Sequence, residues 1–313
     1  MKRPNPETNN ASRDTLHGIS NLAGGLYQHP TNEHVQPSPP LTRDTIHSTL
    51  STSWLGHRIE LFDSLPSTNR EAVQLAQADV EHGTVIVADS QTSGRGRLSR
   101  TWFSPPGANL YCSIILRLTR PPDRLSEWLS WLPLISALAA AEAVEHVSST
   151  HVSVKWPNDL LITERKVGGI LCESGTGISS GSFQIIGIGI NVNSDHDDWP
   201  IDLRNSATSI WQERKIVVDR NRLLAQLLSE LEQCLDELAD HGASRLALAY
   251  HQRSSTVGHR VQATLASGAV LVGFAEGIGQ DGALLLRPEA TQPGITPSEI
   301  VHLRVADIIH ART

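Results

Sequence analysis

The sequence predicts an α+β protein in which a mixed sheet with flanking helices is followed by a small β-rich domain. Residues 53–253 alternate helix-like and β-branched stretches irregularly, a texture that favours α+β packing over a regular doubly wound sheet. Residues 254–313 contain short strand-like runs separated by glycine turns. Residues 1–52 are rich in Pro, Asn, Ser and Thr with Tyr27 as their one aromatic, so we expect a flexible N-terminal extension.

Within the central region, hydrophobic periodicity places the main elements in order. It predicts helices over 71–78, 127–147 (despite Pro133) and 219–240, the last with its leucines on one side. It predicts strands over 84–88, 109–118, 152–156, 169–173 and 183–193. Further along, Gln280, Asp281 and Gly282 form a plausible hairpin turn, because glycine readily adopts positive φ.

Composition limits the classes of partner. The 26 Lys and Arg against 33 Asp and Glu give a net charge of -7, which argues against a generally basic nucleic-acid binder. An anionic ligand must therefore meet a local basic patch. Cys112, Cys172 and Cys234 are widely spaced in apolar sequence and fit reduced core thiols. The longest apolar stretch, 131–141, is too short to span a bilayer, so we expect a cytoplasmic protein with no membrane partner.

A glycine–arginine loop directly after the strand at 84–88 is the first candidate site. Gly94 and Gly96 let the backbone approach a ligand closely, and Arg95, Arg97 and Arg100 place three cations within six residues. Such a loop attracts anions, although a solvated turn of the same composition is an open alternative. The phosphate-binding GxxxxGK[ST] motif is absent, and the glycines at 187 and 189 lack the third glycine of a dinucleotide fingerprint.

A second segment carries Lys155, Trp156, Pro157, Asn158 and Asp159, with Lys166 seven residues after the aspartate. Pro157 should end the strand, so Asn158 and Asp159 are expected at the end of the strand with two lysines nearby. A purely structural alternative pairs Lys155 with Asp159 and buries Trp156 in the core.

Taken together, these segments closely resemble the catalytic domain of biotin–protein ligases. The matching residues are Ser67-Thr68-Asn69, Gln91, Gly94-Arg95-Gly96-Arg97, Trp102-Phe103-Ser104-Pro105, Gly107-Ala108-Asn109-Leu110-Tyr111, Lys155 to Asp159, and Lys166 before Gly169-Ile170-Leu171. The resemblance covers roughly residues 60 to 310. It implies a class II aminoacyl-tRNA-synthetase-like catalytic domain followed by an SH3-like β-barrel. The sequence departs from the family at Leu65-Pro66, where the family often has an aspartate, and at Ser99, where it often has glycine. Both departures affect only the expected loop geometry.

The resemblance also implies a reaction. Biotin and ATP, with Mg²⁺, would form biotinyl-5'-AMP, and biotin would pass to a lysine on the carrier domain of acetyl-CoA carboxylase or a related carboxylase. The implied catalytic residues are Arg97, Lys155, Asp159 and Lys166. The implied biotin-binding residues are Ser67, Thr68, Asn69, Gln91, Arg95, Gly96, Arg97 and Lys166. The implied ATP-binding residues are Arg95, Trp102, Lys155 and Asn191, and no side chain is assigned to the metal.

Two alternatives stay open. A lipoate or octanoate ligase or transferase shares the fold class, but it usually has a run of glycines and lacks KWPND. A biotin-sensing DNA-binding repressor would need an N-terminal winged helix, and residues 1–50 lack amphipathic helices of that kind. We therefore expect a ligase without a DNA partner. Whether it forms a homodimer is left open.

Overall fold

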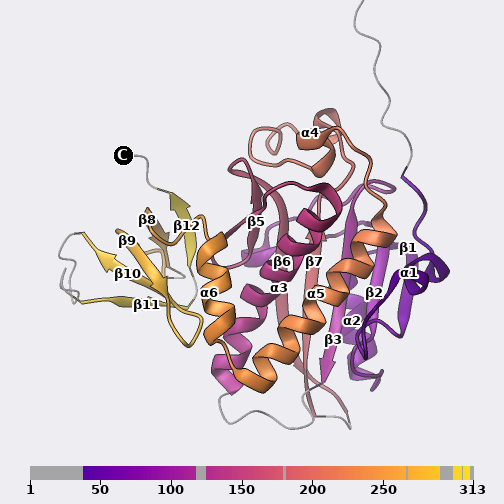
Figure 1. Ribbon diagram of the computed structural model, residues 1–313, viewed down its shortest axis with the longest axis horizontal. Helices are drawn as coiled ribbons and strands as arrows, with labels where there is room; N and C mark the ends of the chain where they lie inside the picture. The colour runs from indigo at the N-terminus through magenta and orange to yellow at the C-terminus, as the bar shows by residue number, and fades with distance from the viewer. Residues whose placement is uncertain are drawn as a thin grey trace, which may run out of the picture. The chain divides into compact units, whose positions relative to one another are not determined.

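A seven-stranded mixed sheet is the centre of the molecule (Figure 1). The structure is a computed structural model that describes residues 38–117, 125–178, 181–265, 267–289, 299–304 and 306–310. The strand order is β1-β2-β3-β7-β6-β5-β4. The β1–β2 pair is parallel and the other pairs are antiparallel. The strands are β1 (Ile59–Leu65), β2 (Val85–Gln91), β3 (Leu110–Arg117), β4 (Ser153–Lys155), β5 (Asp159–Ile162), β6 (Arg165–Thr176) and β7 (Ser182–Ile190).

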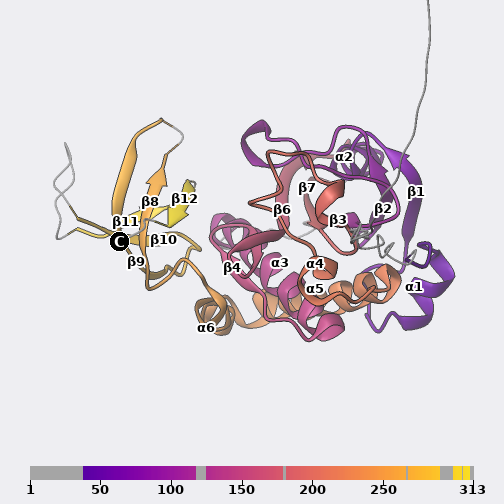
Figure 2. The same ribbon diagram turned by 90° about the horizontal axis from the view of Figure 1, so that it is seen from above.

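Helices cover both faces of this sheet, and its mainly antiparallel pairing agrees with the α+β prediction. Figure 2 shows α3 and α5 against one face and α2 against the other. The helices are α1 (Arg43–Thr49), α2 (Thr68–Gln77), α3 (Leu125–Ser148), α4 (Ile210–Arg214), α5 (Arg220–His241) and α6 (Ser244–Arg253). The α3–α5 side holds the larger hydrophobic core, and Ala72 and Ala76 of α2 pack on a smaller one. The helices predicted over 71–78, 127–147 and 219–240 are confirmed with slightly different ends.

The prediction of a flexible extension through residue 52 is wrong for its last part. Thr42 accepts a hydrogen bond from the Thr45 amide at 3.2 Å and thereby caps α1. Ile46 of this helix is fully buried in the core that α5 shares. The Asn221 side chain of α5 accepts from the Thr42 amide at 2.9 Å and donates to the Pro40 carbonyl at 3.0 Å. Residues 1–37 lie outside the described residues.

A buried carboxylate ties the segment after α1 to α5. Glu232 accepts hydrogen bonds from the amides of Ser53, Trp54 and Leu55 at 2.6, 2.9 and 2.8 Å. Burial alone would raise the pKa of Glu232, but these amide bonds outweigh it and hold the pKa below its ordinary value. The carboxylate therefore stabilises the fold in its ionised form.

The expected small β domain is present as a five-stranded antiparallel sheet with the order β11-β10-β9-β8-β12. The predicted turn joins β9 to β10, where Gly282 has a φ of +72° and the Gly279 amide donates to the Ala283 carbonyl at 2.8 Å. The strands are β8 (Arg260–Thr264), β9 (Val270–Ile278), β10 (Leu284–Pro288), β11 (Val301–Leu303) and β12 (Asp307–His310).

Two tryptophans of the central domain bind this turn. The Trp131 indole of α3 donates to the Gln280 carbonyl at 2.7 Å, and the Trp156 indole donates to the Gly282 carbonyl at 3.2 Å. Both tryptophans are almost fully buried, so the turn is held firmly against the central domain.

Cys112 lies in the core as predicted, whereas Cys172 and Cys234 are half-buried against it, and none of the three is paired with another cysteine. Among the described residues, every helix is too short or too polar to cross a membrane.

Candidate active site

A cavity of about 900 Å³ lies where the central sheet meets the glycine–arginine loop and β12 of the C-terminal sheet. Its lining comes from the start of α2, the end of β2, the loop, the segment after β4, and strands β6 and β7. The structure brings every sequence-predicted site residue to this one cavity: Ser67, Thr68, Asn69, Gln91, Arg95, Gly96, Arg97, Trp102, Lys155, Asp159, Lys166 and Asn191.

One end of the cavity is a network of short polar side chains around the start of α2. Asn69 donates to the Leu171 carbonyl at 3.1 Å and to Glu173 at 2.7 Å, and its oxygen accepts from Ser113 at 2.6 Å. Each end of the Asn69 amide is thus satisfied, which fixes its orientation. Gln91 accepts from the Thr68 amide at 2.9 Å.

Glycines on β7 make room for side chains that cross the sheet. A Cβ at Gly187 would lie 1.9 Å from the Asn69 oxygen, and one at Gly189 would lie 2.7 Å from the Trp102 indole. Both distances are shorter than any contact that atoms tolerate, so only glycine allows these two side chains to lie against the strand. The glycine pair therefore serves close packing beneath the cavity.

The glycine–arginine loop folds as a small hairpin over the cavity. The Gly96 amide donates to the Arg100 carbonyl at 2.7 Å, and the Trp102 amide donates to the Gly94 carbonyl at 2.9 Å. At its tip, Leu98 and Ser99 both adopt positive φ, +54° and +60°. Two successive non-glycine residues in this region are strained, and Ser99 is the position where the sequence departs from glycine.

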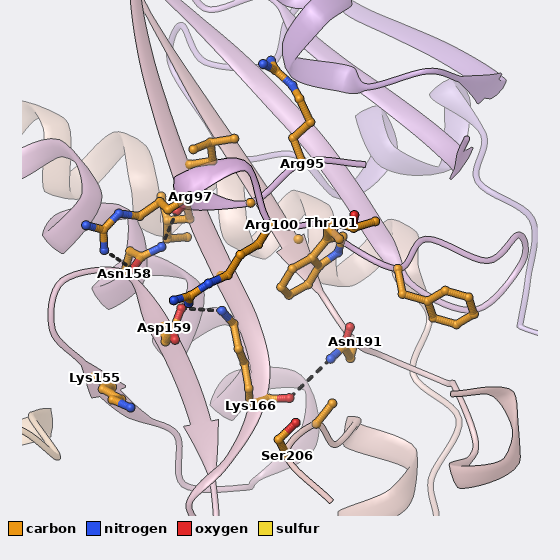
Figure 3. A pocket seen from close by; sticks show the side chains of 18 of the residues that line it. Arg95, Arg97, Arg100, Thr101, Lys155, Asn158, Asp159, Lys166, Asn191 and Ser206 are labelled. Atoms are coloured by element: carbon orange, nitrogen blue, oxygen red, sulfur yellow. Dashed lines mark hydrogen bonds and ion pairs between the residues drawn. The ribbon is translucent and has the colours of Figure 1, made fainter. Parts of the chain in front are cut away.

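The arginines of this hairpin point to different partners (Figure 3). Arg97 donates to the Asn158 side chain at 3.0 Å, whereas Arg95 points away from Arg97 and pairs with Glu173 at 2.8 Å. Burial lowers the pKa of Arg97 from its ordinary value. Arg100 pairs with Asp307 of the C-terminal sheet.

Lys166 lies in the middle of the cavity in contact with two predicted site residues. Its ammonium is 2.5 Å from the Asp159 carboxylate and 5.4 Å from the centre of the Trp102 ring. Gly169 lies beneath the Lys166 and Trp102 side chains, since a Cβ at this position would be 3.3 Å from each of them. The alternative pairing of Lys155 with Asp159 is thus replaced by a Lys166–Asp159 ion pair, while Trp156 is buried as the structural alternative expected.

Lys155 and Asn191 complete the predicted set. Lys155 lies apart from the Lys166–Asp159 pair in Figure 3, and burial lowers its pKa. The Asn191 amide nitrogen donates to the Thr208 carbonyl at 3.0 Å. The Asn191 oxygen and the Trp102 indole nitrogen are buried without a partner among the described residues, which leaves one acceptor and one donor at the cavity wall.

Sequence reasoning did not select three residues that shape this site: Ser113, Glu173 and Asp307. Asn158 was placed at the end of its strand beside Asp159 but was given no role, and the structure shows that it accepts from Arg97. The other three are ordinary polar residues on strands, and only the folded structure reveals their partners.

Carboxylates at the cavity do not form a metal cluster. Asp159, Glu164 and Asp307 line it, and Asp159 and Asp307 are each paired with a cationic side chain. In the described ranges, no group of three or more His, Cys, Asp or Glu residues could hold a metal ion.

Comparisons with known proteins agree on one group. The model of the biotin/lipoate A/B protein ligase family matches residues 61–193. The bifunctional ligase/repressor BirA of Bacillus spizizenii is 35% identical over 255 residues, which cover 82% of this chain and 76% of that protein. A biotin–[acetyl-CoA-carboxylase] ligase of Mycobacterium tuberculosis is 31% identical over 85% of this chain and 97% of its own length. The biotin protein ligase of Aquifex aeolicus, solved with biotin and ATP, superposes with a TM-score of 0.67 at 27% identity, covering 82% of this chain and 100% of that one.

Proposed function

Since this chain belongs to the biotin–protein ligase family, we propose that it joins biotin to ATP as biotinyl-5'-AMP and transfers biotin to a carrier lysine. The observation that carries this proposal is the meeting of Arg97, Arg100, Lys155 and Lys166 at one cavity beside the polar network of α2. The protein is an enzyme of the ligase class, and the bond that it forms is a carbon–nitrogen bond.

The first half-reaction needs concentrated positive charge. The carboxylate of biotin attacks the α-phosphate of ATP and pyrophosphate leaves, so two anions must approach each other. Arg97 and Lys166 supply cations in a cavity where burial strengthens electrostatic interactions. This charge also stabilises the pyrophosphate as it departs.

Biotin fits the polar end of the cavity. Its ureido ring offers one carbonyl acceptor and two N–H donors, which match short hydroxyl and amide side chains. Ser67 is the N-cap of α2 but makes no side-chain capping bond, so its hydroxyl is available to a ligand. Thr68, Asn69 and Gln91 surround the same place.

Adenine fits the opposite part of the cavity, near Trp102 and Asn191. The Trp102 ring offers a stacking surface, and the unpartnered Asn191 oxygen can accept from the adenine amino group. Mg²⁺ prefers phosphate oxygens with one or two carboxylates. Asp159 and Asp307 are already paired, so the ion would be held by ATP itself, with Glu164 as the further carboxylate that lines the cavity.

The second half-reaction needs a neutral amine. The pKa of a free lysine is about 10.4, so its amine is almost wholly protonated at neutral pH. Asp159 is the carboxylate we assign to orient the incoming ammonium and accept its proton. In this structure Asp159 holds Lys166, so the acceptor lysine would replace Lys166 at that carboxylate once the adenylate has formed.

Three further assignments accompany the reaction. The acceptor is the biotin carboxyl carrier domain of a carboxylase, as the name of the M. tuberculosis relative indicates for that protein. We assign residues 38–253 to the catalytic domain, because α1 packs on the same core as α5. The five-stranded C-terminal sheet is the SH3-like barrel of residues 254–313, supported by its strand number and antiparallel order.

Incubation of the protein with biotin, MgATP and a biotin carboxyl carrier domain tests the proposal, with pyrophosphate release and the intact mass of the carrier domain as readouts. We expect pyrophosphate release and the mass increase of one biotinyl group, and neither signal with lipoate in place of biotin. A mass increase with lipoate and none with biotin would overturn the substrate assignment in favour of the lipoate reaction. Salt-dependent binding to DNA would add the repressor function that we do not expect.

A further inference from the structure

The tip of the glycine–arginine hairpin has no hydrophobic anchor. Leu98 at the tip is 59% exposed, and the strained φ angles of Leu98 and Ser99 work against the folded turn. The position of the hairpin over the cavity must therefore come from the side chains that flank the tip.

Three polar contacts hold these flanks. Arg95 pairs with Glu173 of β6, and Arg97 donates to Asn158. Both partners belong to the central sheet region that forms the cavity floor. Arg100 differs, because its partner Asp307 comes from β12 of the C-terminal sheet. The hairpin is thus held on one side by the central domain and on the other by the C-terminal sheet.

Asp307 is itself held in a fixed place. Its chain neighbours Ala306 and Ile308 are buried, and β12 pairs with β8 along Asp307–His310. The sheet is fastened to the central domain by the Trp131 and Trp156 indoles at the β9–β10 turn. A carboxylate on such a support can fix the arginine that it binds.

We propose that Asp307 is a positioning residue that, through its ion pair with Arg100, holds the glycine–arginine hairpin closed over the cavity and so retains biotinyl-AMP. The inference rests on the proposed ligase function. To release the intermediate, the hairpin must lift away from the cavity, and this motion separates Arg100 from Asp307. Removing the pair therefore favours the open hairpin, from which the intermediate escapes and is hydrolysed.

The test measures pyrophosphate released per biotin transferred, with limiting carrier domain, together with the rate at which biotinyl-AMP dissociates from the enzyme. Asp307→Asn and Arg100→Gln should each raise the ratio and the dissociation rate roughly two- to fivefold, the range for a partly exposed ion pair. A general folding defect lowers both products together and leaves the ratio unchanged. The double variant should be no worse than the more affected single variant, because both changes break one contact.

Glu276→Gln is the matched control, since it breaks an exposed ion pair with Arg287 in the same sheet and lies outside the cavity lining. It should retain the intermediate as well as the unchanged protein does. Asp307→Glu, which keeps the carboxylate, should restore most of the retention and separates a loss of charge from a loss of folding.

Three results would overturn the positioning role: Asp307→Asn retaining the intermediate fully, effects that multiply in the double variant, or no rescue by Asp307→Glu. An unchanged protein that makes no biotinyl-AMP would overturn the proposed function itself, and this outcome is distinct from all three.

Discussion

Gly187→Ala places a methyl group where the Asn69 amide now lies. The added Cβ would be 1.9 Å from the Asn69 oxygen and 2.7 Å from its Cγ. The backbone of β7 cannot yield, because Ile186 and Ile188 on either side are buried. The Asn69 oxygen must therefore move by about 1.5 Å to reach an ordinary van der Waals distance.

The displacement has two measurable costs. Asn69 gives up its bonds to Ser113, Leu171 and Glu173, which at about 0.5–1.5 kcal/mol each lowers the free energy of unfolding by roughly 2 kcal/mol. For a chain of this size, Tm falls by about 4–8 °C. Misplacing a binding group by about 1 Å costs on the order of 100-fold, so we expect the KM for biotin to rise by about that factor.

Gly189→Ala is the matched comparison, because it lies two residues further along β7. Its Cβ would meet Trp102 instead, at 2.7 Å. Pyrophosphate release, measured with each substrate varied at saturating concentration of the other, should show a raised KM for biotin in Gly187→Ala and a raised KM for ATP in Gly189→Ala. The reasoning fails if both variants raise the same KM, or if Gly187→Ala changes the KM for biotin by less than about twofold.

Three further predictions follow from the same geometry. Lys166→Met should reduce pyrophosphate release by at least about 100-fold; Lys215→Met, which removes a lysine stacked on Trp211 outside the cavity, should leave the rate unchanged. Arg97→Gly should release biotinyl-AMP early and label unrelated lysines, and tight retention would contradict this role. Glu232→Ala should lower the free energy of unfolding by about 3 kcal/mol at neutral pH. Since the folded pKa is depressed, the stabilisation is present above about pH 4.3 and lost as pH falls through the folded pKa, so denaturant titrations should converge in acid.

The site residues that the sequence could identify are those that stand in short, recognisable motifs. Arg97 and Lys166 stand in recognisable motifs next to predicted strands, and the topology then carries both to one cavity. Arg95 shows the limit of this reasoning. The resemblance implies that it contacts both biotin and ATP, and it does line the cavity, but the direction of its side chain depends on Glu173, whose position is set by the register of β6 with β7.

Tertiary placement also explains what the sequence did not reveal. Asp307 follows Arg100 by more than two hundred residues, and no periodicity links a strand of one sheet to a loop of another. Helix α1 was missed because the nearby prolines and hydroxyl residues resemble a disordered tail, and burial of Ile46 against the α5 side of the core decides otherwise. Helices α2, α3 and α5 were predictable because their periodicity extends over the whole helix, whereas β1, β5, α4 and α6 were not predicted.

The indole of Trp156 links the C-terminal sheet directly to the segment that carries Lys155 and Asp159. Lys155 precedes Trp156 directly and Asp159 follows three residues later, so a single short stretch both lines the cavity and binds the neighbouring sheet. A chain cut before residue 254 would expose that ring and leave its N–H without an acceptor, immediately beside two cavity residues. Removal of the C-terminal sheet should therefore disturb the positions of Lys155 and Asp159 in the cavity, and so affect the site as well as the sheet itself.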